Sequence, residues 1–227
     1  MRLSEIAQHI GGRLVGDDLV VSAISINTRT LQQGDLFIAI KGTNFDAHAF
    51  LDSAKQAGAS AVIAEKQVDI ELSQIIVDDT HLALAELSAA WKQKANVKTV
   101  AVTGSNGKTT VKEMIAAILA CNAKVLSTKG NLNNDIGVPL TLLSLQQQHQ
   151  FAVVEMGANH SGEIAYSSQF AKPDVAVITN IGAAHIEGFG SLEATARAKA
   201  EIFQSLSANG IAILNIDDDF YSLWLEL

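Results

Sequence analysis

The chain has 227 residues, of which 48% are hydrophobic and only two are proline, so it can form one large or two modest folded domains and is too apolar for a disordered chain. Its 16 basic and 24 acidic residues give a net charge of −8, which argues against nucleic acid as the main ligand. No stretch approaches the roughly 18 apolar residues of a membrane span, the N-terminus lacks a signal-peptide pattern, and the lone Cys121 excludes an internal disulfide, so we expect a cytoplasmic globular protein.

The first block of the chain, residues 1–96, mixes helical and strand-like segments. Apolar periodicity predicts helices over residues 3–10 and 46–58. A third helix over residues 80–94 closes the block, with Thr80 as its expected N-cap. The expected strands are residues 19–26, 34–40, 60–65 and 74–79. This order predicts a small mixed α/β domain.

From residue 97 the pattern becomes a regular alternation of strands and helices. The expected strands are residues 98–104, 124–128, 151–157, 174–181 and 210–217. The expected helices are residues 108–121, 138–145, 162–170 and 192–206. The strands are near-continuous apolar runs, which is typical of strands covered on both faces. We therefore expect a doubly wound, mostly parallel sheet of the P-loop ATPase type, cut short after its fifth strand, with ligands at the carboxyl ends of the strands.

The segment "TGSNGKTT", residues 103–110, resembles a phosphate-binding loop. It follows an apolar strand and opens a helix, which would aim backbone N–H groups at an anion. The usual spacing has a glycine six residues before the lysine, and here that position is Val102. Lys108 would reach the phosphates and Thr109 would offer its hydroxyl to Mg²⁺. The alternative is an ordinary strand-to-helix turn with a surface lysine.

Two more strand ends carry groups that a magnesium–triphosphate site needs. Glu155 ends the apolar run "FAVV", and His185 lies in the glycine-rich loop "TNIGAAHIEGFGS" after the next strand. Taken alone, Glu155 is equally explained as a solvated residue at a strand exit, and a lone histidine in a loop is usually just solvated. Because the exits of parallel strands meet at one edge of a sheet, we expect Lys108, Glu155 and His185 to converge on one crevice.

Lys199 shares a helical face with apolar residues. Its spacing from Leu192, Phe203 and Leu206 places it on their stripe. A lysine in such a place either extends to the surface or holds a functional amine near the phosphates. The periodicity leaves both possibilities open.

Five motifs in order resemble the Mur ligase family: "TGSNGKTT", "GNLNNDIGVP", "EMGANHSGEI", "AAHIEGFGS" and "AKAEIF". The glycine loop fits the family pattern T-G-x-x-G-K-T, and "NTRTLQQGDLFIAIKGTNFDAHAF" is similar to the family's UDP-binding domain. The resemblance covers essentially the whole chain. It implies a UDP-precursor-binding domain over residues 1–96 and an incomplete ATP-binding domain over residues 97–227.

The resemblance also implies roles for individual residues. The residues around the ATP phosphates would be Gly104, Ser105, Asn106, Gly107, Lys108, Thr109 and Thr110. Thr109 and Glu155 would bind one Mg²⁺ and His185 a second, while Lys199 matches a lysine that CO₂ carbamylates. Substrate would contact Thr28, Arg29, Asp46, His48, Asn131, Asn133, Asn134, Asp135, Asn159 and His160. Asn27 stands where relatives often carry aspartate, so it receives no role.

The implied activity is ATP-dependent amide-bond formation through an acyl phosphate, with Lys108, Glu155, His185 and Lys199 as the catalytic groups. The motifs are most similar to the member that adds D-Ala-D-Ala to UDP-N-acetylmuramoyl-tripeptide. The family's C-terminal domain has no counterpart here, so we expect this chain alone to be inactive as a ligase. The alternatives are a folylpolyglutamate synthase-like ligase and a non-catalytic nucleotide-binding module.

Overall fold

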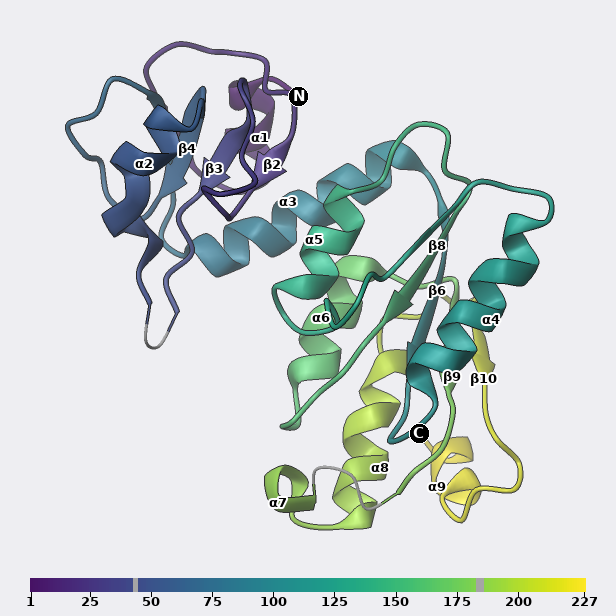
Figure 1. The fold of residues 1–227 in the computed structure, drawn as a ribbon. Helices are drawn as coiled ribbons and strands as arrows, with labels where there is room; N and C mark the ends of the chain where they lie inside the picture. The colour runs from purple at the N-terminus through teal and green to yellow at the C-terminus, as the bar shows by residue number, and fades with distance from the viewer. Residues whose placement is uncertain (43–44, 183–185) are drawn as a thin grey trace. The chain divides into compact units, whose positions relative to one another are not determined.

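The computed structural model describes residues 1–42, 45–182 and 186–227, which form two compact units, Met1–Leu87 and Ser88–Leu227 (Figure 1). The helix α3, Thr80–Ala95, contains residues of both units. The domain boundary between residues 96 and 97 therefore stays a proposal. Among the described residues, no helix has both the length and the apolar composition needed to cross a membrane.

The first unit is built on a mixed five-stranded sheet in the order β1-β5-β4-β3-β2. β1 pairs antiparallel with β5, and the other pairs are parallel. Phe37 and Val62 of two central strands pack against Leu51 and Ala54 of α2, which forms the core on one side of the sheet. The elements are α1 Leu3–His9, β1 Arg13–Val15, β2 Ile24–Ser25, β3 Leu36–Ile38, the 3₁₀ turn η1 Ala47–Phe50, α2 Leu51–Gln56, β4 Ala61–Ala64 and β5 Ser73–Ile76.

The second unit is built on a five-stranded sheet in the order β10-β9-β6-β8-β7, in which every pair is parallel. Its strands are β6 Lys98–Thr103, β7 Val125–Ser127, β8 Phe151–Glu155, β9 Val175–Ile178 and β10 Ile211–Ile213. Its other elements, after α3, are α4 Lys108–Ala120, α5 Gly137–Leu143, α6 Glu163–Ala171, α7 Ile186–Phe189, α8 Leu192–Ala200, η2 Glu201–Phe203 and α9 Tyr221–Leu225.

Helices cover both faces of this second sheet. α5, α6 and α8 lie on one face and α4 on the other (Figure 1). Alternating residues of each strand fill the two cores, because successive side chains of a strand point to opposite faces. Val154 packs with Leu142 and Ile164 on one face, and Val153 packs with Ala116 on the other. The predicted doubly wound α/β architecture is confirmed.

The edge strand β10 departs from the prediction that every strand is covered on both faces. Its Ile211 and Ile213 are 57% and 47% exposed. The register aligns Ile211 with Val175, so the two isoleucines face the side of the sheet on which α4 lies. α4 packs against β6, β7 and β8. The apolar pattern identified the strand correctly but could not report how far one helix extends across the sheet.

Short elements were the least predictable from the sequence. The predicted strand over residues 19–26 contains only Ile24–Ser25, while β1 at Arg13–Val15 had not been predicted. The segment expected to be a loop around residues 182–190 contains α7, and α9 had not been predicted either. The predicted helix over residues 46–58 begins as the 3₁₀ turn η1. Elements of two to five residues are too short for a periodic pattern to stand out.

The N-cap of α3 was predicted one residue too late. Asp79, and not Thr80, caps the helix, because its carboxylate accepts hydrogen bonds from the backbone N–H groups of His81 and Leu82 at 2.7 and 3.1 Å. Thr80 is fully buried as the first helical residue, and its hydroxyl donates to Glu65 at 3.4 Å. Both residue types are good caps, so only the local geometry could distinguish them.

Candidate nucleotide and metal site

The loop between β6 and α4 turns on two glycines with positive φ. Gly104 has φ of 147° and Gly107 has φ of 76°, in the region that residues with a side chain rarely adopt. Gly107 is the N-cap of α4, which has 13 residues and begins at Lys108. The first N–H groups of a helix have no partner within the helix, and its dipole favours negative charge there. The turn therefore has the backbone geometry that can accept an anion.

The end of β9 holds this loop in place. The Thr179 hydroxyl donates to the carbonyl oxygen of Asn106 at 2.7 Å. Asn180 accepts from the backbone N–H of Ser105 through its carbonyl at 2.8 Å, and from that of Asn106 through its side chain at 3.0 Å. Sequence reasoning missed Thr179 and Asn180, whose only mark is that two polar residues end the apolar run "VAVI".

Replacing Gly104 with alanine is expected to destabilise the second unit by about 2 kcal/mol. The added Cβ would overlap the Thr179 hydroxyl and lie 3.2 Å from the Thr179 backbone nitrogen. Thr179 cannot move away without losing its bond to the loop. Urea unfolding measures the loss. Gly107→Ala is the matched control, because its Cβ would meet open space and only the positive φ would cost about 1 kcal/mol. Equal losses in the two variants would contradict the close contact.

Glu155 lies at the carboxyl end of β8 beside this loop. It is 2% exposed, and its register aligns it with Val102 of β6. One carboxylate oxygen accepts a hydrogen bond from the Thr109 hydroxyl at 2.8 Å, and the other accepts from the Asn133 side-chain amide at 2.8 Å. A buried carboxylate needs such partners. Three segments far apart in sequence therefore meet at one carboxyl group.

Lys108 folds back over the glycine loop. Its ammonium group donates to the carbonyl oxygen of Gly104 at 2.8 Å and to that of Ser105 at 3.4 Å. Burial lowers the pKa of Lys108, and the negative charge of Glu155 partly opposes this shift. The structure thus brings Lys108 and Glu155 together, as expected. His185, the third member of the expected group, lies outside the described residues.

Lys199 is held inside the second unit and does not extend to solvent. It is 2% exposed, and its ammonium lies 5.7 Å from the centre of the Phe189 ring. Burial lowers the pKa of Lys199 to about 8, and repulsion from the Lys108 ammonium adds to the shift. The predicted apolar stripe was wrong, because α8 ends at Ala200 and Leu192 is 41% exposed. The Lys199 amine nevertheless lies close enough to Lys108 for the charge of that lysine to lower its pKa.

The loop after β7 contributes one side chain to Glu155 and uses a second to start a helix. Asn133 binds Glu155, and its backbone carbonyl accepts from the N–H of Gly157 at 2.8 Å. The Asn134 side chain accepts from the N–H of Gly137, the first residue of α5, at 2.8 Å. The remaining predicted substrate residues of this unit, Asn131, Asp135, Asn159 and His160, are exposed in the loops after β7 and β8.

In the first unit, Asp46 and His48 form a hydrogen-bonded pair. His48 Nε2 accepts from the backbone N–H of Glu65 at 2.9 Å, so in the neutral ring Nδ1 carries the proton that it shares with Asp46 at 2.6 Å. Hydrogen bonds from the His48 backbone and ring lower the pKa of Asp46. The pair follows β3, the parallel neighbour of β2.

The turn after β2 contains the other predicted residues of this unit, Thr28 and Arg29. The Asn27 side chain accepts from the Arg29 N–H at 3.0 Å, and the Asn27 carbonyl accepts from the Thr30 N–H at 3.2 Å. Asn27 therefore closes an Asx turn, a structural task that asparagine and aspartate both perform. This explains why the departure at Asn27 leaves the turn intact.

The chain matches two protein-family models, described as "Mur ligase middle domain" over residues 102–227 and "Mur ligase family, catalytic domain" over residues 20–123. The first alone covers more than half of the chain. The chain belongs to the Mur ligase family.

Two curated relatives of this Mur ligase chain carry the same name. It is 50% identical over 222 residues to the UDP-N-acetylmuramoyl-tripeptide--D-alanyl-D-alanine ligase of Escherichia coli (strain K12), and the match covers 98% of this chain and 49% of that protein. The enzyme of the same name from Bacillus subtilis (strain 168) is 42% identical over 93% of this chain and 48% of its own length. The chain spans about half the length of the curated relatives it matches.

Solved structures are similar over the same extent. MurF from Acinetobacter baumannii superposes with a TM-score of 0.94 at 42% identity, covering 98% of this chain and 50% of that one. The MurF ligase from Thermotoga maritima in complex with ADP gives a TM-score of 0.84 at 37% identity, covering 93% of this chain and 50% of that one. The fold expected from the resemblance to the Mur ligases is therefore confirmed.

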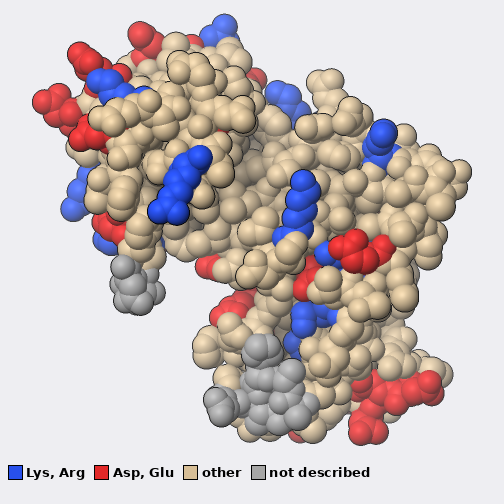
Figure 2. Space-filling model, in the orientation of Figure 1, with Lys and Arg blue, Asp and Glu red and all other residues tan. Residues whose placement is uncertain are grey.

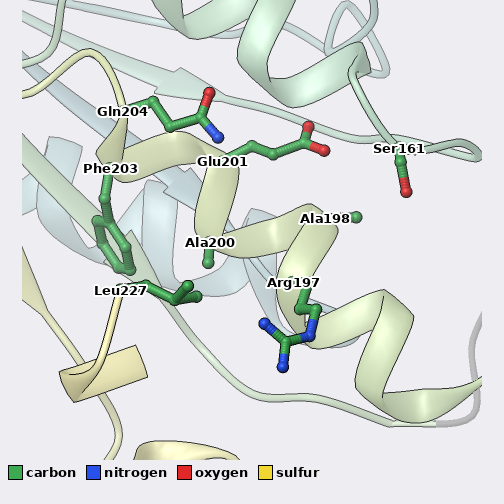
Figure 3. Close-up of a pocket in the computed structure, with 8 residues that line it drawn as sticks. All are labelled: Ser161, Arg197, Ala198, Ala200, Glu201, Phe203, Gln204 and Leu227. Atoms are coloured by element: carbon green, nitrogen blue, oxygen red, sulfur yellow. The ribbon is translucent and has the colours of Figure 1, made fainter. Parts of the chain in front are cut away.

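A pocket of about 390 Å³ lies beside α8 and η2, and its lining among the described residues includes none of the predicted site residues (Figure 3). Its lining includes Arg197, Glu201 and Leu227, and the Glu201 side chain extends toward the Ser161 loop (Figure 3). The Glu201 carboxylate accepts from the N–H groups of Gly162 at 2.7 Å and Ala165 at 3.1 Å. Glu201 thus joins the segment after Lys199 to the start of α6.

On the face drawn in Figure 2, basic and acidic side chains lie among many uncharged residues. Lysine and arginine residues lie scattered among neutral ones there, and no continuous basic surface is visible among the described residues of that face.

Proposed function

We propose that this Mur ligase chain binds ATP and a UDP-linked precursor for the enzyme that joins D-Ala-D-Ala to UDP-N-acetylmuramoyl-tripeptide in cytoplasmic peptidoglycan synthesis. The observation that carries the proposal is the pair of 2.8 Å hydrogen bonds that join Thr109 and Asn133 to Glu155 beside the glycine loop. The shared name of relatives at 42–50% identity supports the choice of substrates.

The ATP phosphates would lie against the first turn of α4. Lys108 would leave the carbonyl oxygen of Gly104 and bind phosphate oxygens, whose negative charge would add to that of Glu155 in compensating this partly buried amine. The first backbone N–H groups of α4 and the helix dipole would add further stabilisation. The proposed phosphate-binding residues are Gly104, Ser105, Asn106, Gly107, Lys108, Thr109 and Thr110.

The donor set at Glu155 fits Mg²⁺. A carboxylate and a hydroxyl, here Glu155 and Thr109, are hard oxygen ligands, and Mg²⁺ at nucleotide sites is completed by phosphate oxygens and water. No cluster of three histidine, cysteine or acidic side chains able to hold a metal occurs in the described ranges. His185 is proposed to complete a second metal site. Bound Mg²⁺ would neutralise charge on the phosphates during transfer.

Lys199 is proposed to be carbamylated. Its lowered pKa of about 8 leaves an appreciable fraction of neutral amine near neutral pH, and only the neutral amine attacks CO₂. The ammonium first loses one proton. The neutral nitrogen then bonds to the carbon of CO₂ as one C=O π bond opens to give a carboxylate oxygen, and a second proton leaves the nitrogen, so the side chain changes overall from cation to anion. That change would remove the repulsion between Lys199 and Lys108.

Precursor contacts are proposed for each unit by itself. In the first unit the proposed contacts are Thr28, Arg29, Asp46 and His48. In the second unit they are Asn131, Asn133, Asn134, Asp135, Asn159 and His160. Asp46 and His48 already hold each other in one orientation, and such preorganisation lowers the entropy cost of binding.

In the proposed reaction, the terminal carboxylate of the tripeptide attacks the γ-phosphorus of ATP and forms an acyl phosphate, releasing ADP. The amine of D-Ala-D-Ala then attacks the acyl carbon, loses a proton, and expels phosphate as the amide bond forms. Two anions must approach each other in the first step, so the protein contributes mainly positioning and positive charge. Lys108 would supply that charge from the protein.

This chain alone is proposed to lack ligase activity, because it spans only about half the length of the relatives that are named as ligases. Measurable D-Ala-D-Ala addition by the 227-residue chain would contradict this part of the proposal.

Isothermal titration tests which ligands the chain binds. We expect it to bind UDP-N-acetylmuramoyl-tripeptide and a non-hydrolysable ATP analogue with Mg²⁺. Arg29→Met should weaken precursor binding, and Arg13→Met is the matched control because Arg13 is exposed in the same unit. Binding of a folate in place of the precursor would indicate a folylpolyglutamate synthase-like ligase. Binding of nucleotide alone would indicate a nucleotide-binding module.

A further inference from the structure

Lys112 is a buried cation with no part in the phosphate and metal contacts described above. It lies one turn after Lys108 in α4 and is 1% exposed. Its ammonium donates to the carbonyl oxygen of Thr128 at 2.7 Å and pairs with Glu113 at 2.8 Å. A lysine is almost never fully buried unless its charge is compensated. The hydrogen bond to the Thr128 carbonyl oxygen is therefore part of what compensates the buried ammonium group.

Thr128 directly follows β7, where pairing with β8 becomes irregular. Its N–H donates to the Val153 carbonyl at 3.0 Å, as in a parallel ladder. If the ladder continued regularly, the Glu155 N–H would donate to the Thr128 carbonyl oxygen. Instead, the Glu155 N–H donates to the Thr128 hydroxyl at 2.9 Å. The carbonyl that the ladder would have used is the one that Lys112 holds.

The chain leaves the sheet at this point and comes back to Glu155. The loop after Thr128 returns with Asn133, whose amide donates to the Glu155 carboxylate at 2.8 Å. The backbone of the same residue accepts from Gly157 at 2.8 Å. Glu155 is thus fixed at its backbone by Thr128 and at its carboxylate by the loop that starts there.

We propose that Lys112 is a positioning residue for Glu155. Because Lys112 binds the Thr128 carbonyl oxygen, that oxygen does not accept the Glu155 N–H, and the Thr128 hydroxyl accepts it instead. The same change in backbone direction lets the following loop place Asn133 at the Glu155 carboxylate. The proposal rests on the proposed function, in which Glu155 binds Mg²⁺. It extends that function to a lysine that touches neither metal nor nucleotide.

Two single variants and their combination test the proposal in the 227-residue chain. Lys112→Met leaves the Thr128 carbonyl without its donor. Thr128→Val is nearly isosteric and removes only the acceptor of the Glu155 N–H, so it carries the test if Lys112→Met does not fold. Lys124→Met is the matched control, because it removes an exposed lysine just before the other end of β7. Circular dichroism checks folding.

Two readouts separate positioning from general stability. The first is the affinity for a non-hydrolysable ATP analogue with and without Mg²⁺. We expect the gain in affinity that Mg²⁺ provides to fall by about tenfold to 100-fold in each single variant, with no further fall in the double variant and no change in Lys124→Met. The second is hydrogen exchange of the Glu155 amide, which should become faster in Lys112→Met and Thr128→Val.

Folded single variants that keep both the full magnesium gain and a protected Glu155 amide would overturn the proposal. An equal loss of affinity with and without Mg²⁺ would also overturn it, since that pattern reports a structural role. If the unaltered chain binds nucleotide without any magnesium gain, the proposed function fails. The Glu155 exchange rate then still decides whether Lys112 positions that residue.

Discussion

Replacing Lys108 with methionine is expected to weaken binding of a magnesium–ATP analogue by about 100-fold while the second unit stays folded. Hydrogen bonds to charged groups contribute about 1.5–3 kcal/mol, and about 3 kcal/mol corresponds to roughly 100-fold in affinity. The amine lies across the loop, 2.8 Å from the Gly104 carbonyl, where phosphate oxygens would replace a neutral acceptor. Methionine has an unbranched side chain that matches the stem of lysine up to Cε, and it lacks the ammonium group with its charge and donors.

Isothermal titration measures this loss, and tryptophan fluorescence checks folding, because Trp91 and Trp224 both belong to the second unit. Lys98→Met is the matched control. Lys98 begins the strand that ends at the loop, so the same charge is removed at the opposite end of β6. Unchanged nucleotide affinity in Lys108→Met would reduce the glycine loop to an ordinary strand-to-helix turn.

Replacing Lys199 with methionine is expected to raise the free energy of unfolding of the second unit by up to about 3 kcal/mol at pH 7. The pKa of this lysine is about 8 in the folded chain against an ordinary value of 10.5, so folding must keep a buried ammonium at neutral pH. A lowered lysine pKa means that the folded chain binds fewer protons than the unfolded chain. The stability of the unaltered chain therefore rises with pH between about 8 and 10.5.

The pH dependence distinguishes this charge effect from a change in packing. The advantage of Lys199→Met should be largest below pH 8 and should disappear as the pH approaches 10.5. Urea unfolding, followed by tryptophan fluorescence in buffer free of bicarbonate, measures it without carbamylation. Lys124→Met serves as control, because that lysine is exposed. A stability difference that stays constant from pH 7 to pH 10.5 would show that burial of the charge is not the cause.

The alternation of apolar strands and amphipathic helices along the sequence predicted most of the second unit. Apolar runs separated by amphipathic helices can be arranged in few ways, so the parallel sheet and the meeting of Lys108 and Glu155 at its edge could be derived. Glycines at 104 and 107 marked the turn because only positive φ values allow it. The positions of Lys108 and Glu155 followed from the topology of the sheet, whereas their roles remain proposals.

Contacts between distant segments could not be derived. Thr179 and Asn180 hold the glycine loop through four hydrogen bonds, yet ordinary polar residues end many strands. Lys112 is buried and donates to the Thr128 carbonyl oxygen just after β7, a contact that the helical pattern of α4 does not indicate. The partners of such groups depend on three-dimensional neighbours that no local pattern encodes.

The exposed isoleucines of β10 have a consequence for handling the protein. β10 is an edge strand of the described sheet, and an uncovered apolar edge offers free backbone groups to another chain. Concentrated samples should therefore self-associate by edge-to-edge strand pairing. A lysine in place of Ile211 would act as a gatekeeper, keeping the chain monodisperse in light scattering without disturbing its two cores.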